Sequence, residues 1–462
     1  MPLMEWKSLL DHRRIRDLFD GGPTQRVQSE LRGEIERDYG RCLFSTPVRR
    51  LIHKTQFFPL ERNDSVRTRL AHSLEVSSVA RSLGMYAARF IKTRDMTLEF
   101  RHLQDIEWIA ATCGLIHDLG NPPFGHAGEL AIGTWFQDQL HADGTFFDTM
   151  DGKDSQYAKD FLKFEGNAQT LRLVSHLQLL SDPYGLNLTT ATFSAACKYL
   201  ASSAEADREN PNHAFAKPGY FSSERSVVDK VRMATGTHNR RNPITYLVEA
   251  ADDIVYTTVD LEDAVKKKLL QWNQVEPLLK KSTFGESIIE KVRRRVSGDD
   301  GETLAQLFRV IAITEMVSSA LEVFKSRYTL IMNGEYGGEL IGDPDSPTQR
   351  LCEIIRKEVL KPHLYTSPEI LRLEVRGRKV IHDLMTMFWE ATKETTGTTE
   401  TQTYPGKLYL LTSDNYRRVF TERLNKAEEP DKYIRLQLVT DTVSGMTDSF
   451  ACQLHKELTN GV

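Results

Sequence analysis

The sequence predicts a mainly α-helical fold with a further helical region toward the C-terminus and at most one small β hairpin. Apolar residues recur at helical spacing in several long segments, and the alternating patterns of half-buried strands are scarce. The 462 residues are 40% hydrophobic and 27% charged, which is the composition of a globular protein. A chain of this length can bury a large core, as one big domain or two closely joined ones.

The helical patterns follow one another along the chain. Residues 69–91 place apolar side chains such as Leu74 and Val79 at spacings of two to four, which predicts an amphipathic helix. Residues 105–120 are apolar on nearly all sides, so we expect this helix to be central and buried. Further helices are expected over residues 167–180, 188–201 and 245–270.

The remaining segments set the expected boundaries. We expect loops or insertions at residues 141–157, 204–219 and 392–403. The run 327–341 contains an Asn-Gly and a Gly-Gly pair, which predicts the small hairpin. We divide the chain into an N-terminal arm (1–37), a catalytic helical core (38–280) and a C-terminal helical region that packs on the core (281–462).

Charge and hydropathy exclude several classes of protein. The net charge of −4 gives no overall basic field of the kind that marks nucleic-acid binders. The longest nearly apolar stretch, residues 106–116, is shorter than the roughly 20 residues that a membrane helix needs. The five cysteines are scattered and form no CxxC pair. We therefore expect a cytoplasmic protein with buried free thiols and no membrane segment.

The stretch GLIHDLGNPPFGHAGE (114–129) contains the first candidate functional residues. It places His117 and Asp118 at the end of an apolar helix, where an unpaired carboxylate would be costly. His72 on the helix before it and one aspartate of the pair Asp252-Asp253 could converge on the same point. Two nitrogen and two oxygen ligands suit manganese, magnesium, iron(II), cobalt or nickel better than a closed zinc site. The alternative is a buried His-Asp pair without a metal.

A second His-Asp pair lies in the C-terminal region. His382 and Asp383 have no glycine-rich break after them and no companion histidine. We interpret this second pair as structural.

Other polar residues fit an anionic ligand beside the metal. Asp252, Tyr256 and Asp260 step by four residues, so they share one face of their helix. Arg69 lies one turn before His72, and an arginine beside a metal indicates a ligand such as phosphate. Each of these patterns also has a plainer interpretation as chance polar positions on a solvated face.

More candidates for binding a polyanion lie between residues 165 and 217. They are Glu165, Asn167 and Arg172 at a helix start, Lys198 at a helix end, and Lys217 in a turn. A solvated surface charge is the plainer interpretation of each lysine. The sequence has no Walker A loop and no GxGxxG motif, so P-loop and Rossmann chemistry are not indicated.

Several ordered motifs together resemble one enzyme family. They are RTRLAHSLEV (67–76), GLIHDLGNPPFGHAGE, FEGNAQTLRL (164–173), KPGYF (217–221) and EAADDIVYTTVDLEDA (249–264). The chain resembles HD-domain deoxynucleoside triphosphate (dNTP) triphosphohydrolases, most closely the bacterial dGTPase-type enzymes. The resemblance runs from about Asp38 to Ala451. It implies a helical HD core and the release of intact triphosphate from a dNTP, which leaves the deoxynucleoside.

The resemblance also implies a role for each candidate residue. The metal ligands would be His72, His117, Asp118 and Asp252. His126 and Glu129 would serve catalysis near the α-phosphate. The phosphate contacts would be Arg69, Asn167, Lys198, Tyr199, Lys217 and Tyr256. Gln56 and Asp260 would meet the sugar 3′-hydroxyl, and Tyr256 would leave no room for a 2′-hydroxyl.

The resemblance implies a divalent cofactor, foremost Mn²⁺ or Mg²⁺, with Fe²⁺, Co²⁺ or Ni²⁺ as further candidates. The expected partners are the dNTP substrate, a homo-oligomer with a hexamer favoured, and single-stranded nucleic acid as a further candidate. Two alternatives stay open: another HD phosphohydrolase acting on nucleoside monophosphates, cyclic nucleotides or alarmones, and an inactive nucleotide-sensing regulator.

The chain departs from the family pattern at three places. A KYP turn is common after the 188–201 helix, and this chain reads KYL (198–200). Many relatives have His where this chain has Asn121. The run SGMTDSFA (444–451) resembles a family GMTDRYA with Ser449 and Phe450 substituted.

Overall fold

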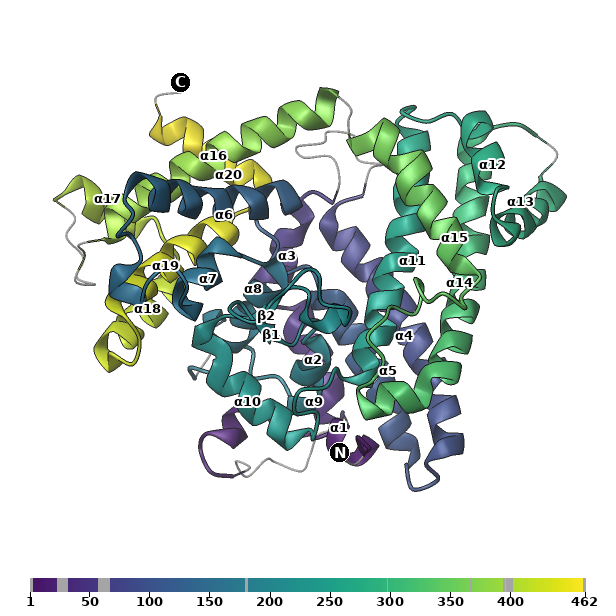
Figure 1. Ribbon diagram of the computed structural model, residues 1–462, viewed down its shortest axis with the longest axis horizontal. Helices are drawn as coiled ribbons and strands as arrows, with labels where there is room; N and C mark the ends of the chain where they lie inside the picture. The colour runs from purple at the N-terminus through teal and green to yellow at the C-terminus, as the bar shows by residue number, and fades with distance from the viewer. Residues whose placement is uncertain are drawn as a thin grey trace.

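The computed structural model describes residues 3–22, 32–56, 67–178, 182–296, 298–365, 368–393, 395 and 402–459. Helices dominate this part of the chain, and the predicted fold class is confirmed (Figure 1). The helices up to residue 142 are α1 (Trp6–Leu9), α2 (Glu34–Leu43), α3 (Thr46–Arg50), α4 (Arg69–Arg94), α5 (Phe100–Ile116) and α6 (Gly125–Ala142).

The middle of the chain has shorter elements and one long helix. They are α7 (Gln156–Leu162), α8 (Gly166–Arg172), the π-helix η4 (Leu173–Leu177), α9 (Thr190–Ala196), β1 (Ala201–Ser202), β2 (Pro218–Tyr220), α10 (Arg225–Ala234) and α11 (Pro243–Lys266). The later elements are α12 (Trp272–Leu279), α13 (Thr283–Arg295), α14 (Gly301–Asn333), α15 (Thr348–Glu353), the π-helix η7 (Ile354–Tyr365), α16 (Pro368–Thr392), α17 (Tyr404–Leu410), α18 (Asp414–Lys426), α19 (Asp431–Ser444) and α20 (Asp448–Leu458).

Three long helices form the centre of the fold. Helix α4 packs against α5, and α11 packs against both (Figure 1). The Thr68 hydroxyl caps α4 by accepting a hydrogen bond from the Ala71 amide. Asn242 caps α11 in the same way, and Pro243 occupies its first turn, where a missing N–H costs nothing. The nearly all-apolar α5 is buried between its neighbours, as expected for this pattern.

Two apolar cores flank this centre. One joins α4, α5 and α11 to the long helix α14 on the right of Figure 1. The other joins α6 and α7 to α16, α19 and α20 on the left. Both cores combine residues from before and after residue 280. The proposed division into 1–37, 38–280 and 281–462 stays a prediction.

The predicted hairpin over residues 327–341 is wrong. Residues 327–333 continue α14, and Gly334 ends the helix in the left-handed conformation with φ of 74°. An Asn-Gly pair can start a tight turn or end a helix, because both need a residue with positive φ. The strands that the structure does contain, β1 and β2, pair in parallel and come from segments 201–202 and 218–220.

Element boundaries differ from the predictions in several places. The helix predicted over 105–120 ends at Ile116, so His117 and Asp118 lie in the turn that follows. The segment 167–180 divides into α8 and η4, and its last two residues lie outside the described residues. Most of the expected loop at 392–403 also lies outside them. Within the described ranges, no helix combines the length and the apolar character needed to cross a membrane.

Candidate functional site

The predicted site residues converge on one cavity of about 590 Å³. Its walls come from α4, α5, α6, α8 and α11, from the turn after α5, and from the segment after α9. The predicted residues among its lining are Gln56, Arg69, His117, Asp118, His126, Glu129, Asn167, Lys198, Tyr199, Lys217, Asp252 and Tyr256. We call this space the candidate cavity. A volume of this size lies within the range of small-molecule sites.

Three side chains from three helices form a compact group at this cavity. His72 from α4, His117 at the end of α5 and Asp252 from α11 each offer one ligand atom, and these atoms lie within 4.8 Å of one another. The His72 Nε2 atom lies 3.1 Å from Asp252 Oδ1, and His117 Nε2 lies 3.5 Å from the same oxygen. We call these three residues the His–Asp group. Imidazole and carboxylate ligands at this spacing could hold a divalent cation.

Hydrogen bonding orients the two imidazoles. The His117 Nδ1 atom donates a hydrogen bond of 2.7 Å to the Gly114 carbonyl, which directs Nε2 toward the carboxylates. His117 Nε2 and His72 Nδ1 are buried and have no hydrogen-bond partner among the described residues. Buried polar atoms are rarely left unpartnered in native proteins. His117 Nε2 faces Asp252, so the donor set and this unpartnered atom fit a metal ion.

The carboxylates dominate the electrostatics of this group. Burial alone would lower the pKa of His117, but Asp118 and Asp252 raise it to about 9. Burial would raise the pKa of Asp252, but His117 and His72 hold it well below its usual range. The group thus favours cationic character at its centre.

The fourth predicted ligand, Asp118, makes two other contacts. Its Oδ2 atom pairs with the Arg69 guanidinium, and its Oδ1 atom accepts a hydrogen bond of 2.6 Å from the Asn121 amide. Asp118 Oδ2 also lies 3.5 Å from His117 Nε2, which keeps it next to the His–Asp group. Asn121 therefore orients a candidate ligand.

His126 and Glu129 form a pair across one turn of α6. The His126 Nδ1 atom donates a hydrogen bond of 2.8 Å to Glu129 Oε2, so Nε2 is the nitrogen left to face the cavity. The His126 side chain is 88% exposed, whereas Glu129 is 12% exposed and also accepts a hydrogen bond from the Gly166 amide. The bond to Glu129 raises the pKa of His126 above its ordinary value. An open imidazole held by a buried carboxylate can exchange protons.

Two glycines bring α8 against the turn after α5. A Cβ atom on Gly120 would lie 2.1 Å from the Gly166 carbonyl oxygen, and one on Gly166 would lie 2.4 Å from the Asn121 amide oxygen. A side chain at Gly120 would require backbone movement, and one at Gly166 would displace the side chains of Asn121 and Glu129. This close approach lets the Gly166 amide reach Glu129.

The predicted phosphate contacts gather on the cavity wall beyond the His–Asp group. The ammonium groups of Lys198 and Lys217 both lie 5.9 Å from the centre of the Tyr199 ring. Lys217 pairs with Glu165 at 3.0 Å, and Lys198 lies 3.7 Å from Glu249. Two lysines around one tyrosine form an electropositive wall that suits an anion.

Each of these lysines is held cationic by its carboxylate. Burial lowers the pKa of Lys217, but Glu165 raises it above its ordinary value. Burial likewise lowers the pKa of Lys198, and Glu249 more than compensates. Glu165 also accepts a hydrogen bond of 2.6 Å from the Asn167 amide. Both lysines are therefore held in position by acidic residues.

The two predicted sugar contacts lie in different surroundings. Gln56 lines the cavity, and its buried Oε1 atom has no hydrogen-bond partner within the described part of the chain. Asp260 is buried on α11 but does not line the cavity, and its Oδ2 atom lacks a described partner as well. Burial raises the pKa of Asp260 well above its ordinary value. Asp260 is thus buried and is not among the residues that line the cavity.

Some lining residues carry no signal in the sequence. Arg356 of η7 and Ile370 and Glu374 of α16 reach the cavity from the C-terminal region. They belong to no motif, and their contact with the site depends on how distant helices pack. The Lys198–Glu249 pair is equally invisible in the sequence, because no periodicity links its partners.

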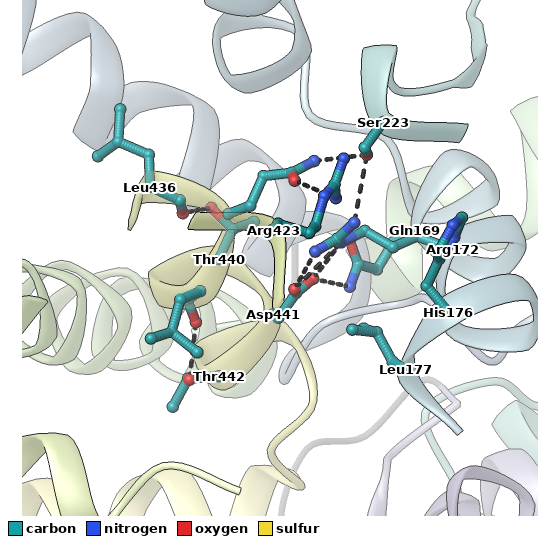
Figure 2. A network of polar contacts seen from close by, with 12 residues as sticks. Gln169, Arg172, His176, Leu177, Ser223, Arg423, Leu436, Thr440, Asp441 and Thr442 are labelled. Carbon is teal, nitrogen blue, oxygen red and sulfur yellow. Dashed lines mark hydrogen bonds and ion pairs between the residues drawn. The ribbon is translucent and has the colours of Figure 1, made fainter. Parts of the chain in front are cut away.

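Arg172 points away from the cavity, contrary to its grouping with Asn167. Its guanidinium donates to Asp441 on α19 at 2.7 Å (Figure 2). It also donates to Glu224 at 3.1 Å. Gln169 donates to the same Asp441 carboxylate at 2.9 Å. We call Arg172, Asp441 and Glu224 the arginine network. It ties the end of α8 to the C-terminal helices and does not contribute to the cavity surface.

The second His-Asp pair makes separate contacts outside the cavity. His382 Nε2 lies 3.1 Å from the Thr134 hydroxyl oxygen. Asp383 pairs with Lys379 and with His455, each at 2.7 Å. Neither member of this pair lines the candidate cavity.

Comparison with known proteins connects this geometry to a family. Residues 69–181 match the HD domain, a segment that includes His72, His117 and Asp118. A Listeria monocytogenes protein named deoxyguanosinetriphosphate triphosphohydrolase-like protein is 37% identical over 474 aligned residues, which cover 99% of this chain and 100% of the relative. A Synechocystis protein of the same name is 34% identical and covers 98% and 99%. A Klebsiella pneumoniae protein named deoxyguanosinetriphosphate triphosphohydrolase is 30% identical and covers 99% of both chains.

Proposed function

Because this chain belongs to the HD-domain family of deoxyguanosinetriphosphate triphosphohydrolases and their like, we propose that it hydrolyses deoxynucleoside triphosphates. The products would be the deoxynucleoside and inorganic triphosphate. The observation that carries the proposal is the convergence of three kinds of group on one cavity. A group that could hold a metal, an imidazole–carboxylate pair and an electropositive wall are the requirements for attack at a phosphorus atom.

We propose His72, His117, Asp118 and Asp252 as the metal ligands, with Mn²⁺ or Mg²⁺ as the first candidates. A divalent ion at this position would supply Lewis-acid polarisation of a phosphoryl oxygen and neutralise charge. Arg69 pairs with Asp118, so that carboxylate would be shared between the guanidinium and the ion. Its fixed fork of donors suits bidentate phosphate contact.

His126 is the proposed proton-transfer residue. Glu129 holds its Nδ1–H, and the free Nε2 can then accept or donate a proton at the reacting oxygen. The raised pKa keeps the imidazolium form available at neutral pH. The pH profile of kcat would separate the acid role of His126, which needs the imidazolium, from the base and nucleophile roles, which both need the neutral ring.

The proposed binding residues hold the two ends of the nucleotide. Asn167, Lys198, Tyr199, Lys217 and Tyr256 would contact the phosphates, and Gln56 and Asp260 would contact the 3′-hydroxyl. The pairing of both lysines with carboxylates keeps them extended into the cavity before substrate arrives. Such preorganisation reduces the entropy lost on binding.

The test is a product assay. The purified protein is incubated with each dNTP and each NTP in the presence of Mn²⁺ or Mg²⁺, and the products are separated by ion exchange. We expect tripolyphosphate and the free deoxynucleoside from dNTPs only, and the relative rates would report the base preference. Orthophosphate or pyrophosphate as the first product would contradict the proposal and favour another HD phosphohydrolase. No turnover of any nucleotide, despite binding, would favour a nucleotide-sensing regulator.

We also propose that the chain forms a homo-oligomer, with a hexamer favoured. The support for this proposal is the family resemblance, and mass photometry at several protein concentrations would test it. Binding of single-stranded nucleic acid and a cytoplasmic location stay predictions.

A further inference from the structure

The corner between α19 and α20, residues 441–448, contacts three segments that carry proposed active-site residues. Asp441 contacts α8 through the arginine network (Figure 2). The Ser444 carbonyl accepts a hydrogen bond of 3.0 Å from Lys54. Asp448 contacts both Thr55 and Phe124. A short C-terminal segment therefore touches the surroundings of the cavity at several points.

Asp448 makes the most specific of these contacts. Its side chain is buried, and its Oδ1 atom accepts a hydrogen bond of 3.0 Å from the Phe124 amide. Its Oδ2 atom accepts from the Thr55 amide at 3.0 Å and from the Thr55 hydroxyl at 2.5 Å. Thr447, and not Asp448, caps α20 through its hydroxyl. Both Asp448 oxygens are therefore engaged by other segments and not by its own helix.

The Thr55 contact leads to the proposed metal ligands. The Thr55 carbonyl accepts from Arg69 Nε at 3.2 Å and from Arg69 Nη2 at 3.0 Å. The third guanidinium nitrogen pairs with Asp118. Fixing Thr55 thus fixes the arginine that orients Asp118.

The Phe124 contact leads to the proposed proton-transfer residue. Phe124 adopts φ of 64°, a left-handed conformation that is unfavourable for a residue with a side chain. It directly precedes α6, whose first turn carries His126 and Glu129. Backbone in such a conformation persists only where its surroundings hold it, and the Asp448 carboxylate supplies that hold at the amide.

Lys54 adds a second link between the same segments. Its ammonium group is buried and donates to the Asn121 carbonyl at 2.5 Å as well as to Ser444. Asn121 in turn donates to Asp118. Two routes therefore connect the corner to Asp118, beside the His–Asp group. One runs through Thr55 and Arg69, and the other runs through Lys54 and Asn121.

We propose that Asp448 is a positioning residue, which sets the placement of His126 through Phe124 and of Arg69 through Thr55. The inference rests on the proposed function for its effect on catalysis. It assigns a role to a residue outside the HD domain match, which ends at residue 181. The role requires an acceptor with two oxygens, because Asp448 serves two segments at once.

The experiment compares matched variants in the full-length protein. Asp448→Asn keeps the shape and one acceptor oxygen, but its amide nitrogen cannot accept a hydrogen bond, so the oxygen can serve Thr55 or Phe124 and not both. Thr55→Val removes only the hydroxyl, and Thr55→Ser restores it. Ser449→Ala alters the exposed neighbour and serves as the control. Each variant is measured for kcat and KM with a dNTP, for Tm, and for amide hydrogen exchange over residues 121–126.

We expect Asp448→Asn to lower kcat by about 10- to 100-fold, the effect of misplacing a reacting group by roughly 1 Å. Thr55→Val should lower kcat/KM by a smaller factor, Thr55→Ser should restore it, and Ser449→Ala should match the wild type. Amide exchange over 121–126 should accelerate in Asp448→Asn at temperatures where the protein stays folded. A lower Tm with unchanged kcat, KM and local exchange would overturn the inference.

The two readouts separate this inference from the proposed function. If the wild type releases no tripolyphosphate from any dNTP, the proposed function fails. The exchange measurement still decides whether Asp448 holds the 121–126 segment. If the wild type is active and Asp448→Asn is equally active with unaltered exchange, the inference alone fails.

Discussion

The His–Asp group and the arginine network are both buried and ionic, yet they differ in how their polar atoms are satisfied. In the arginine network every nitrogen of the Arg172 guanidinium has a partner, in Asp441, Glu224 or Ser223. Figure 2 shows the contacts with Asp441 and Ser223. In the His–Asp group the buried His117 Nε2 atom, which faces Asp252, has no hydrogen-bond partner among the residues described. The first cluster is complete with protein atoms alone, whereas the second has the composition of a site that needs a further group.

This difference separates residues that hold the fold from residues that act on a ligand. A buried charge is tolerated when opposite charges and hydrogen bonds compensate its lost hydration. Arg172 meets that condition through protein atoms, so we expect its effect to be on stability. In the His–Asp group a bound metal cation would supply this compensation. We therefore expect substitutions of His72 and His117 to change metal content and turnover. Substitutions in the arginine network should therefore lower stability, whereas substitutions in the His–Asp group should lower metal content and turnover.

The largest effect is expected for Asp252→Ala. Asp252 is the oxygen donor nearest to both histidines, so its loss should abolish metal binding and reduce triphosphate release to background. Metal content is measured by mass spectrometry of the metal, alongside the product assay. A variant that keeps stoichiometric metal would remove Asp252 from the proposed ligand set.

His126→Ala is the matched control for that variant. It should retain the metal and lower kcat by about 10²- to 10⁴-fold, the range for loss of a general acid or base. A chelator should destabilise the wild type, by about 2.7 kcal/mol if the ion is present at 100 times its Kd, and should not affect Asp252→Ala. Normal turnover by His126→Ala would show that the proton-transfer assignment is wrong.

Arg172→Met should change stability and not metal binding, in contrast to Asp252→Ala. It leaves the Asp441 and Glu224 carboxylates buried without their cation, which should lower the free energy of unfolding by about 3–5 kcal/mol. Urea denaturation with and without metal checks this, and added metal should not restore the loss. Arg294→Met, at an exposed arginine beside Glu290, is the control and should change stability by less than about 1 kcal/mol.

The acid stability of the protein should report the same network. Burial raises the pKa of Glu224, but Arg172 and His176 lower it to about 2 from an ordinary 4.5. The stabilisation from a lowered pKa is complete above pH 4.5 and is lost as the pH falls toward 2. It amounts to about 3 kcal/mol at neutral pH. Unfolding curves between pH 5 and 2 should therefore be flatter for Glu224→Gln than for the wild type.

The smallest effect is expected for His382→Ala. This half-buried histidine belongs to the second His-Asp pair and contacts Thr134, away from the cavity. We expect unchanged metal content, turnover within about twofold of the wild type, and a loss of roughly 1 kcal/mol for the hydrogen bond. A loss of turnover comparable to that of His126→Ala would contradict its structural interpretation.

Local patterns in the sequence predicted the central part of the fold well. The amphipathic segment 69–91 and the apolar segment 105–120 both form helices, because their burial follows directly from residue periodicity. The motif residues His72, His117 and Asp252 also meet, although this depends on three helices packing together. The Asn333-Gly334 pair led to the wrong prediction of a hairpin, because the same pair occurs in hairpin turns and at helix ends.

What the sequence could not predict depends on contacts between distant elements. The partners Lys217–Glu165 and Lys198–Glu249 are set by tertiary packing, which leaves no periodic trace. Asp260 is likewise buried by the elements that pack against α11, and its spacing of four residues from Tyr256 does not predict this burial. The wall residues Arg356 and Glu374 follow no motif at all.

The contacts of Asp441 and Asp448 bear on the order in which a newly made chain becomes competent. Translation proceeds from the N-terminus, so every proposed metal ligand and both members of the His126–Glu129 pair are synthesised long before residue 441. The hydrogen bonds to α8, Thr55 and Phe124 form only after the α19–α20 corner has emerged and docked. A nascent or prematurely terminated polypeptide would thus carry the full set of proposed reactive side chains without the contacts that align them.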